Sequence, residues 1–126
     1  MIFGIGTDIV SVSRIEDLHV RYGGKLAERI LAPEEWGDYA EATAKAHFLA
    51  KRFAAKEAFS KAAGTGMRAP IYFHSVIVVH DKRGKPGFVH SPELNAWLKS
   101  HHIRSTHLSL SDEKDYVVAF VVMEQA

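Results

Sequence analysis

The hydrophobic positions of the chain follow the helical period in some segments and the strand period in others, in mixed order. The expected strands cover residues 2–10, 75–80, 87–90, 106–111 and 116–123. The expected helices cover residues 12–22, 33–39, 46–63 and a segment that begins at 91–92. Because the later strands come in adjacent pairs separated by short turns, the pattern predicts an α+β fold that is largely antiparallel.

Local signals indicate where several of these helices begin and end. Gly23 and Gly24 are expected to end the first helix, and Gly64 to end the long helix as a C-terminal cap. Ser91 followed by Pro92 is typical of a helix start, with the serine as N-cap. The 126 residues contain no repeat and no linker long enough to divide them, so we expect a single domain over residues 1–126.

Charged residues interrupt the long helix, which is otherwise apolar. Lys56, Glu57 and Lys61 stand among alanine and phenylalanine residues, and buried ions are costly unless they are paired or bind something. Glu57 and Lys61 share an arc of the helix with Ala50 and Ala54, whose small side chains we expect to leave room for a ligand. The alternative is a solvated Glu–Lys pair at i and i+4, which stabilises a helix by about 0.2–0.5 kcal/mol.

A second carboxylate, Asp8, lies near the end of the first strand. Gly4 and Gly6 share its face, and we interpret them as clearing the approach to the carboxylate. They do not form a dinucleotide-binding fingerprint, because Ile9 stands where a third glycine is needed. Mg²⁺ takes one or two protein carboxylates and completes its shell with water and phosphate oxygens, which Asp8 and Glu57 would suit if the fold brings them together. The alternative is that Asp8 caps the following helix.

Two other polar segments are candidates, each with a simpler structural explanation. His107, Ser109 and Ser111 share one face of a strand, and such a face is either functional or only solvated. The Gly-Thr-Gly turn at residues 64–66 forms either an anion-binding nest or a helix stop followed by a turn.

Basic residues form two local groups, although the formal net charge is only +1. Arg14 and Arg21 lie seven apart on one helix face, where they meet an acidic partner or are plain solvated surface. The loop at residues 81–86 is a basic hairpin tip, which is likewise either a contact site or plain solvated surface. A balance this close to neutral does not indicate a nucleic-acid-binding protein.

Composition is that of an ordinary globular protein, with 47% apolar and 25% charged residues. The absence of cysteine excludes disulfides and thiolate metal sites and fits a reducing compartment. The first residues have neither the basic start of a signal peptide nor an apolar run that could span a membrane. We therefore expect a cytoplasmic protein without a membrane partner.

Several segments together carry a resemblance to a known family. They are residues 4–10 (Gly-Ile-Gly-Thr-Asp-Ile-Val), 48–61, 64–66, 84–86 and 107–113. In this order and at this chain length, they closely resemble the holo-acyl-carrier-protein synthases, the small bacterial type of 4′-phosphopantetheinyl transferase. The resemblance covers nearly the whole chain. It implies a largely antiparallel sheet wrapped on a long central helix. It also implies transfer of phosphopantetheine from coenzyme A to a serine of apo acyl carrier protein, with release of adenosine 3′,5′-bisphosphate.

The resemblance also implies roles for individual residues. Asp8 and Glu57 would hold Mg²⁺ against the diphosphate of coenzyme A, and Lys61 would place a positive charge near the same phosphates. The residues expected to contact coenzyme A are Arg52, Lys61, Gly64, Thr65, Pro86 and His107. Arg14 and Arg21 would face an acidic helix of the carrier protein. The base that activates the serine would be Glu57 or a water held near Asp8, and the sequence does not choose between them.

Members of this family are commonly trimers with the site at the subunit boundary, and we expect the same here. The chain departs from its relatives at 43–46, where only Lys45 is basic, so the 3′-phosphate contact is left to Arg52 or to the 82–85 loop. Ser11 stands where relatives often have Glu. Ala32 replaces a capping Ser or Thr, at an expected local cost of about 1 kcal/mol.

Two other functions compete with the transferase. A non-catalytic nucleotide- or RNA-binding module would use the basic residues, but Tyr72, Phe73 and Phe88 do not form a recognisable stacking platform. A Mg²⁺-dependent phosphohydrolase would use the same carboxylates and would hydrolyse coenzyme A without a carrier protein.

Overall fold

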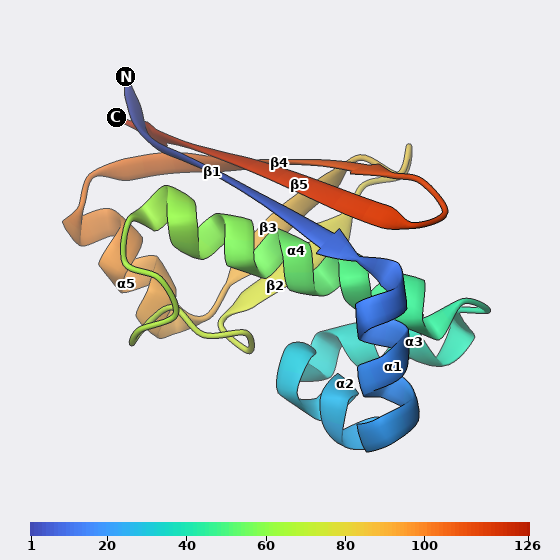
Figure 1. Ribbon diagram of the computed structural model, residues 1–126. Coiled ribbons are helices and arrows are strands. Elements are labelled where there is room, and N and C mark those ends of the chain that lie inside the picture. Colours follow the sequence, from blue (N-terminus) through green and yellow to red (C-terminus); the bar gives the residue numbers. More distant parts are fainter.

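The computed structural model describes residues 1–126, which form two antiparallel sheets packed around one long helix (Figure 1). The larger sheet has the strand order β1-β5-β4, and β2 and β3 form a separate hairpin. The strands are β1 (Ile2–Ser11), β2 (Val76–His80), β3 (Pro86–His90), β4 (Ile103–Asp112) and β5 (Tyr116–Gln125). The α+β class and the antiparallel pairing predicted from the sequence are confirmed.

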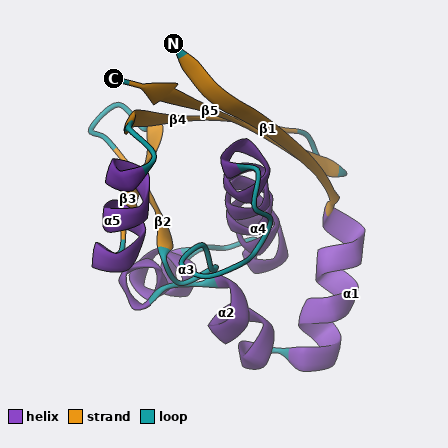
Figure 2. Ribbon diagram, turned by 90° about the vertical axis from the view of Figure 1, so that its left-hand side faces the viewer, coloured by secondary structure: helices purple, strands orange, loops and turns teal.

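Helix α4 (Lys45–Ala63) runs beneath the three-stranded sheet, with the other helices at its sides. Figure 2 shows α1 on one side of α4, and α5 with the β2–β3 hairpin on the other. These helices are α1 (Val12–Tyr22), α2 (Gly24–Ile30), the 3₁₀ helix η1 (Pro33–Glu35), α3 (Trp36–Glu41) and α5 (Pro92–Ser100). The arrangement agrees with the expected sheet wrapped on a central helix.

The helix ends follow the local signals, with one exception. Gly64 has a φ of 79° and ends α4 in the left-handed conformation, and the Ser91 hydroxyl accepts the Leu94 N–H at the start of α5. Helix α2 was not predicted, because Gly23 ends α1 but the chain re-enters a helix at once. Burial of Ala27 and Ile30 stabilises this short helix, which local propensity does not favour.

Strand β1 and helix α4 cross in close contact at two glycines. A Cβ at Gly4 would lie 2.0 Å from the Ala62 carbonyl oxygen, and a Cβ at Gly6 would lie 2.1 Å from that of Ala58. Any side chain at either position would force the helix away from the strand. The interpretation that these glycines clear the approach to Asp8 is therefore wrong, because they allow α4 to approach β1.

Two alanines of α4 also have a packing role. Ala50 and Ala54 are fully buried and belong to the hydrophobic core with Val117 and Ala119 of β5. The expectation that these alanines leave room for a ligand is wrong, because the core fills the space beside them. Small residues here keep the helix close to the sheet.

The three-stranded sheet has one buried face and one open apolar face. Val117, Ala119 and Val121 of β5 point toward α4 and are fully buried. The opposite face exposes Ile5, Ile9 and Phe120, whose exposed fractions are 60%, 66% and 42%. Large apolar side chains gathered on an open sheet face are typical of an interaction surface. None of the helices combines the length and apolar character needed to cross a membrane.

The glycine crossing leads to a prediction about stability. Gly6→Ala should lower the free energy of unfolding by about 1–3 kcal/mol, because the added Cβ overlaps backbone rather than a flexible side chain. Urea denaturation followed by circular dichroism measures this change. The matched control is Gly37→Ala in α3, where nothing lies near the added Cβ, and it should leave stability unchanged or raise it by about 0.5–1 kcal/mol. Equal stability of both variants would contradict the close crossing.

Candidate active site

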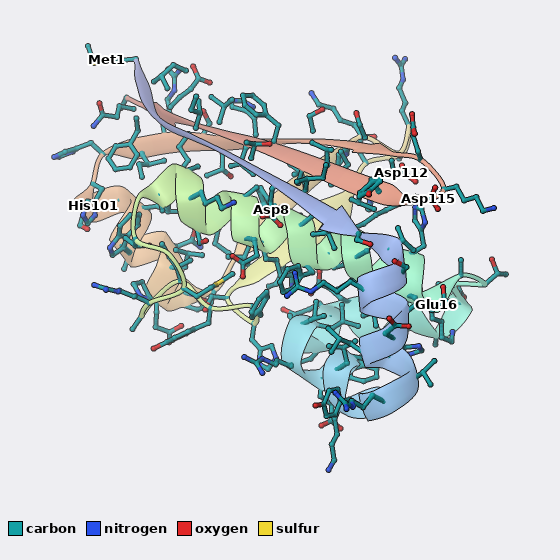
Figure 3. The ribbon with its side chains drawn as sticks, viewed as in Figure 1. Met1, Asp8, Glu16, His101, Asp112 and Asp115 are labelled. Carbon is teal, nitrogen blue, oxygen red and sulfur yellow. The ribbon has the colours of Figure 1, made fainter.

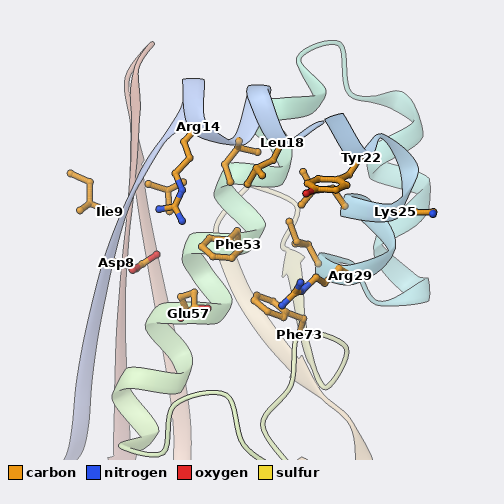
Figure 4. Close-up of a pocket in the computed structure, with 14 residues that line it drawn as sticks. Asp8, Ile9, Arg14, Leu18, Tyr22, Lys25, Arg29, Phe53, Glu57 and Phe73 are labelled. Atoms are coloured by element: carbon orange, nitrogen blue, oxygen red, sulfur yellow. The ribbon is translucent and has the colours of Figure 1, made fainter. Parts of the chain in front are cut away.

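A cavity of about 480 Å³ lies between the end of β1 and helices α1, α2 and α4. Figure 4 shows Asp8 and Glu57 beside each other at one side of it, one from the strand and one from α4. The rings of Phe53 and Phe73 stack at 5.6 Å along another part of the wall. A mostly apolar cavity with a few gathered charges is the usual form of a small-molecule site.

Asp8 lies where β1 passes over α4 (Figure 3), and Lys61 reaches it from one turn beyond Glu57. The Lys61 ammonium donates to Asp8 Oδ1 and to the Thr7 carbonyl oxygen, each at 3.0 Å. The Asp8 side chain is 15% exposed, whereas that of Lys61 is 53% exposed. The ammonium therefore has solvent access for a third, incoming acceptor. The fold thus brings together Asp8, Glu57 and Lys61, which the family resemblance implied and the spacing of the residues alone left open.

The environment of Glu57 perturbs its carboxyl group. Burial raises the pKa of Glu57, the negative charge of Asp8 raises it further, and the Lys61 ammonium opposes both effects. A carboxyl group with a raised pKa beside another carboxylate is a candidate for proton transfer or for binding a cation.

The donor set fits Mg²⁺ better than a metal that is held wholly by the protein. No group of three or more histidine, cysteine, aspartate and glutamate side chains is placed to hold a metal ion. Asp8 and Glu57 are nevertheless two hard oxygen donors at one cavity, which matches a Mg²⁺ ion completed by water and phosphate oxygens.

Arg52 does not line this cavity, contrary to the expectation from the sequence. Its side chain is buried, and the guanidinium group donates to Glu35 Oε2 at 2.9 Å and to the Val78 carbonyl oxygen at 3.2 Å. Lys56 is also fully buried and pairs with Glu35. Glu35, which sequence analysis missed, explains both buried cations, and its carboxylate also accepts the N–H of the uncapped Ala32 at 2.8 Å.

Pro86 and His107 lie outside the cavity as well. Strand register places Asp8 opposite Ala119 on the helix side of the sheet, whereas His107 pairs with Val122 on the outer side. The His107 Nε2 atom lies 2.6 Å from a Glu124 carboxylate oxygen on that outer side. Within one chain, His107 and Asp8 therefore face opposite sides of the sheet.

The Gly-Thr-Gly turn follows α4 directly after Lys61. The Gly64 N–H donates to the Lys61 carbonyl oxygen at 3.0 Å, and the Gly66 N–H donates to that of Ser60 at 3.3 Å. The Thr65 hydroxyl donates to the Gly66 carbonyl oxygen at 2.8 Å. Because both glycine amides are used within the turn, the structure favours the helix stop over an anion-binding nest.

Basic side chains gather at the rim of the cavity. Arg14 from α1 and Lys25 and Arg29 from α2 all line it, whereas Arg21 lies further along α1 with its guanidinium 5.9 Å from the Tyr22 ring centre. Arg14 was predicted from the sequence as a partner-binding residue, whereas Phe73 was not predicted as part of a cavity wall. No spacing signal links Phe73 to α4, because a loop brings it there.

Comparisons with known proteins agree with this fold. A sequence profile described as the 4′-phosphopantetheinyl transferase superfamily matches residues 4–121. The chain is 54% identical over 125 residues to a holo-[acyl-carrier-protein] synthase from Nitrosomonas europaea, covering 99% of this chain and 100% of the relative.

Solved structures give the same result. The chain is similar to the crystal structure of a holo-[acyl-carrier-protein] synthase from Neisseria meningitidis, with a TM-score of 0.96, 50% identity and coverage of 99% and 100% of the two chains. It is also similar to a holo-(acyl-carrier-protein) synthase from Bacillus anthracis in complex with CoA (3′,5′-ADP). There the TM-score is 0.82, the identity is 38%, and 100% of this chain and 99% of that chain are covered.

The electrostatics of the site predict a titration. In metal-free protein, carboxyl NMR should place the pKa of Glu57 above that of an ordinary glutamate, and Asp8→Asn should lower it part of the way back. Because the native pKa is raised, this group makes the protein less stable as the pH rises through that value.

The control for this titration is Asp17→Asn, which removes the same charge from the exposed part of α1 and should leave the Glu57 titration unchanged. A Glu57 that titrates as a freely solvated glutamate would contradict the geometry.

Proposed function

The chain belongs to the 4′-phosphopantetheinyl transferase superfamily, and on this premise we propose that it modifies acyl carrier protein. It transfers the 4′-phosphopantetheine group of coenzyme A to a serine of apo acyl carrier protein and releases adenosine 3′,5′-bisphosphate. The observation that carries the site assignment is the meeting of Asp8 and Glu57 at one cavity beside Lys61. In this proposal the reaction serves fatty acid biosynthesis and takes place in the cytoplasm.

Asp8 and Glu57 are the residues that would hold Mg²⁺ against the diphosphate of coenzyme A. The ion, when bound, neutralises charge on the phosphate oxygens. The Lys61 ammonium holds Asp8 Oδ1 and offers its solvent-accessible side to the same diphosphate, as a compact positive charge, while the second oxygen of Asp8 would take the metal. The apolar wall with Phe53 and Phe73 receives the pantetheine arm. Gly64 and Thr65, at the end of α4, extend the contact surface toward the nucleotide.

The chemical step is a displacement at the β-phosphorus of coenzyme A. The serine oxygen of the carrier protein forms the new P–O bond, and the bond from that phosphorus to the bridging oxygen breaks. The bridging oxygen leaves with adenosine 3′,5′-bisphosphate. We assign the serine proton to Glu57, because this carboxylate faces the cavity in which the diphosphate would lie.

The acyl carrier protein docks beside the cavity at the basic rim. Arg14, Lys25 and Arg29 line that rim, and Arg21 continues the positive charge along α1. Acidic groups of the carrier protein match this surface in charge, which favours rapid encounter and a fixed orientation.

We further propose a homotrimer that shares its sites between subunits. The open face with Ile5, Ile9 and Phe120 supplies apolar area for self-association. His107 lies on this same face, so a neighbouring subunit brings it toward the cavity even though its own chain does not. The contact of Pro86 with coenzyme A that the resemblance implies is likewise assigned to a neighbouring subunit.

The competing functions have weaker support. The relatives are enzymes by name, and Phe53 and Phe73 stack in a cavity wall instead of forming an open platform for nucleic-acid bases. A phosphohydrolase would not need the basic rim.

Glu57→Gln tests the site directly. The variant should fold normally but lose about 100-fold or more in kcat/KM, because it removes a metal-binding and proton-accepting carboxylate at nearly constant volume. Release of adenosine 3′,5′-bisphosphate, followed by chromatography with and without Mg²⁺, measures the effect.

The control is Glu41→Gln at the exposed end of α3, which should keep wild-type turnover. Normal Mg²⁺-dependent turnover in Glu57→Gln would overturn the assignment. Release of the bisphosphate without carrier protein would instead indicate the phosphohydrolase.

Self-association has its own test. Phe120→Glu places a charge in the open apolar face and should convert a trimer into a monomer with reduced turnover, whereas Val20→Glu on α1 should remain trimeric. Light scattering together with the turnover assay measures both properties. A fully active wild-type monomer would be incompatible with shared sites.

A further inference from the structure

A buried ion cluster lies behind the cavity, on the core side of α4. Glu35, Arg52 and Lys56 are 1%, 4% and 0% exposed, and one carboxylate faces two cations. None of the three lines the cavity. The proposed reaction therefore gives the cluster no direct chemical role.

Glu35 is fully satisfied even without Lys56. Its carboxylate accepts the Arg52 guanidinium at 2.9 Å and the backbone N–H groups of Ala32 and Val78 at 2.8 and 3.1 Å. Arg52 alone therefore balances the buried negative charge. A second buried cation is costly to desolvate, and burial lowers the pKa of Lys56 while Glu35 opposes that effect.

Lys56, the second buried cation, has two acceptors besides Glu35, and both are backbone carbonyl oxygens of residues in the cavity wall. The Lys56 ammonium donates to the carbonyl oxygens of Ile30 and Phe73, each at 2.8 Å, and to Glu35 Oε1. These bonds use all three of its N–H donors. Ile30 ends α2 and Phe73 lies in the loop after α4, and both residues line the cavity. One side chain thus ties two separate wall segments to the central helix.

We propose that Lys56 is a positioning residue that fixes the distance from α4 to the walls at Ile30 and Phe73, and so sets the affinity for coenzyme A. This inference rests on the proposed function, in which those walls receive the pantetheine arm. The Phe73 ring stacks on Phe53, one helical turn before Glu57, so a shift of the wall also moves the surface beside the carboxylate pair.

Two substitutions separate positioning from stability. Lys56→Met removes the ammonium and both wall contacts, but it leaves the Glu35–Arg52 pair intact. Glu35→Gln removes the carboxylate that Lys56 contacts and leaves Arg52 with only the exposed Asp38 carboxylate at 3.5 Å, but it keeps the wall contacts. It is therefore expected to destabilise the fold more.

We expect Lys56→Met to raise KM for coenzyme A by about tenfold, because displaced walls no longer fit the pantetheine arm. We expect smaller effects on kcat and on the KM for carrier protein, within about threefold of wild type, because the carboxylate pair and the basic rim border these walls but are not held by Lys56 directly. Glu35→Gln should change KM for coenzyme A by less than about threefold. A larger KM effect in Glu35→Gln, or an unchanged KM in Lys56→Met, would overturn the proposal.

Hydrogen exchange tests, without any enzymatic assay, whether Lys56 holds the wall segments at Ile30 and Phe73. In Lys56→Met, the amides of Leu31 and Ser75, which adjoin the two wall segments, should exchange about tenfold faster relative to β5 amides than in wild type. Unchanged relative exchange would also overturn the proposal. If wild-type protein transfers nothing to a carrier protein, the proposed function fails, whereas the exchange data still decide whether Lys56 holds the walls.

Discussion

The close crossing of β1 and α4 is the contact on which the site depends. Gly4 and Gly6 let the helix backbone approach the strand to a distance that no side chain would permit. This approach sets Asp8, which follows Gly6 in β1, beside Glu57 and Lys61, which lie on the same part of α4 as Ala58. A helix held farther from the strand would separate the two carboxylates and would remove the contribution that the Asp8 charge adds to burial in raising the pKa of Glu57.

Helix α4 carries two sets of charges that serve different ends. Arg52 and Lys56 point into the interior and both pair with Glu35, which ties η1 and β2 to the helix. Glu57 lines the cavity, and Lys61 lies beside it on Asp8 and keeps solvent access. A rigid interior network and an accessible charged pair on one helix give a preorganised site, because the same element carries both.

The sequence could predict the elements and the carboxylate site, but not every partner of those residues. Glu57 and Lys61 follow from helical spacing, and Asp8 from its place at a strand end. The family resemblance placed Arg52 at coenzyme A, and the sequence offered no signal against this, because a charged residue in a helix looks the same whether its partner is a ligand or a distant buried carboxylate.

Glu35 is that distant carboxylate, and it is separated from Arg52 along the chain, so only the tertiary structure reveals the pair. The packing of Gly4 against Ala62 is likewise invisible to periodicity, and so is the loop that carries Phe73 into the wall. His107 shows a further limit. Alternation along β4 gave its face, but only strand register shows that this face lies opposite Asp8.

The most direct measurement of the central claim is the mass of apo acyl carrier protein after incubation with this protein, coenzyme A and Mg²⁺. We expect a gain equal to one phosphopantetheine that disappears with EDTA, whereas no gain with several carrier proteins from a well-folded sample would contradict the account.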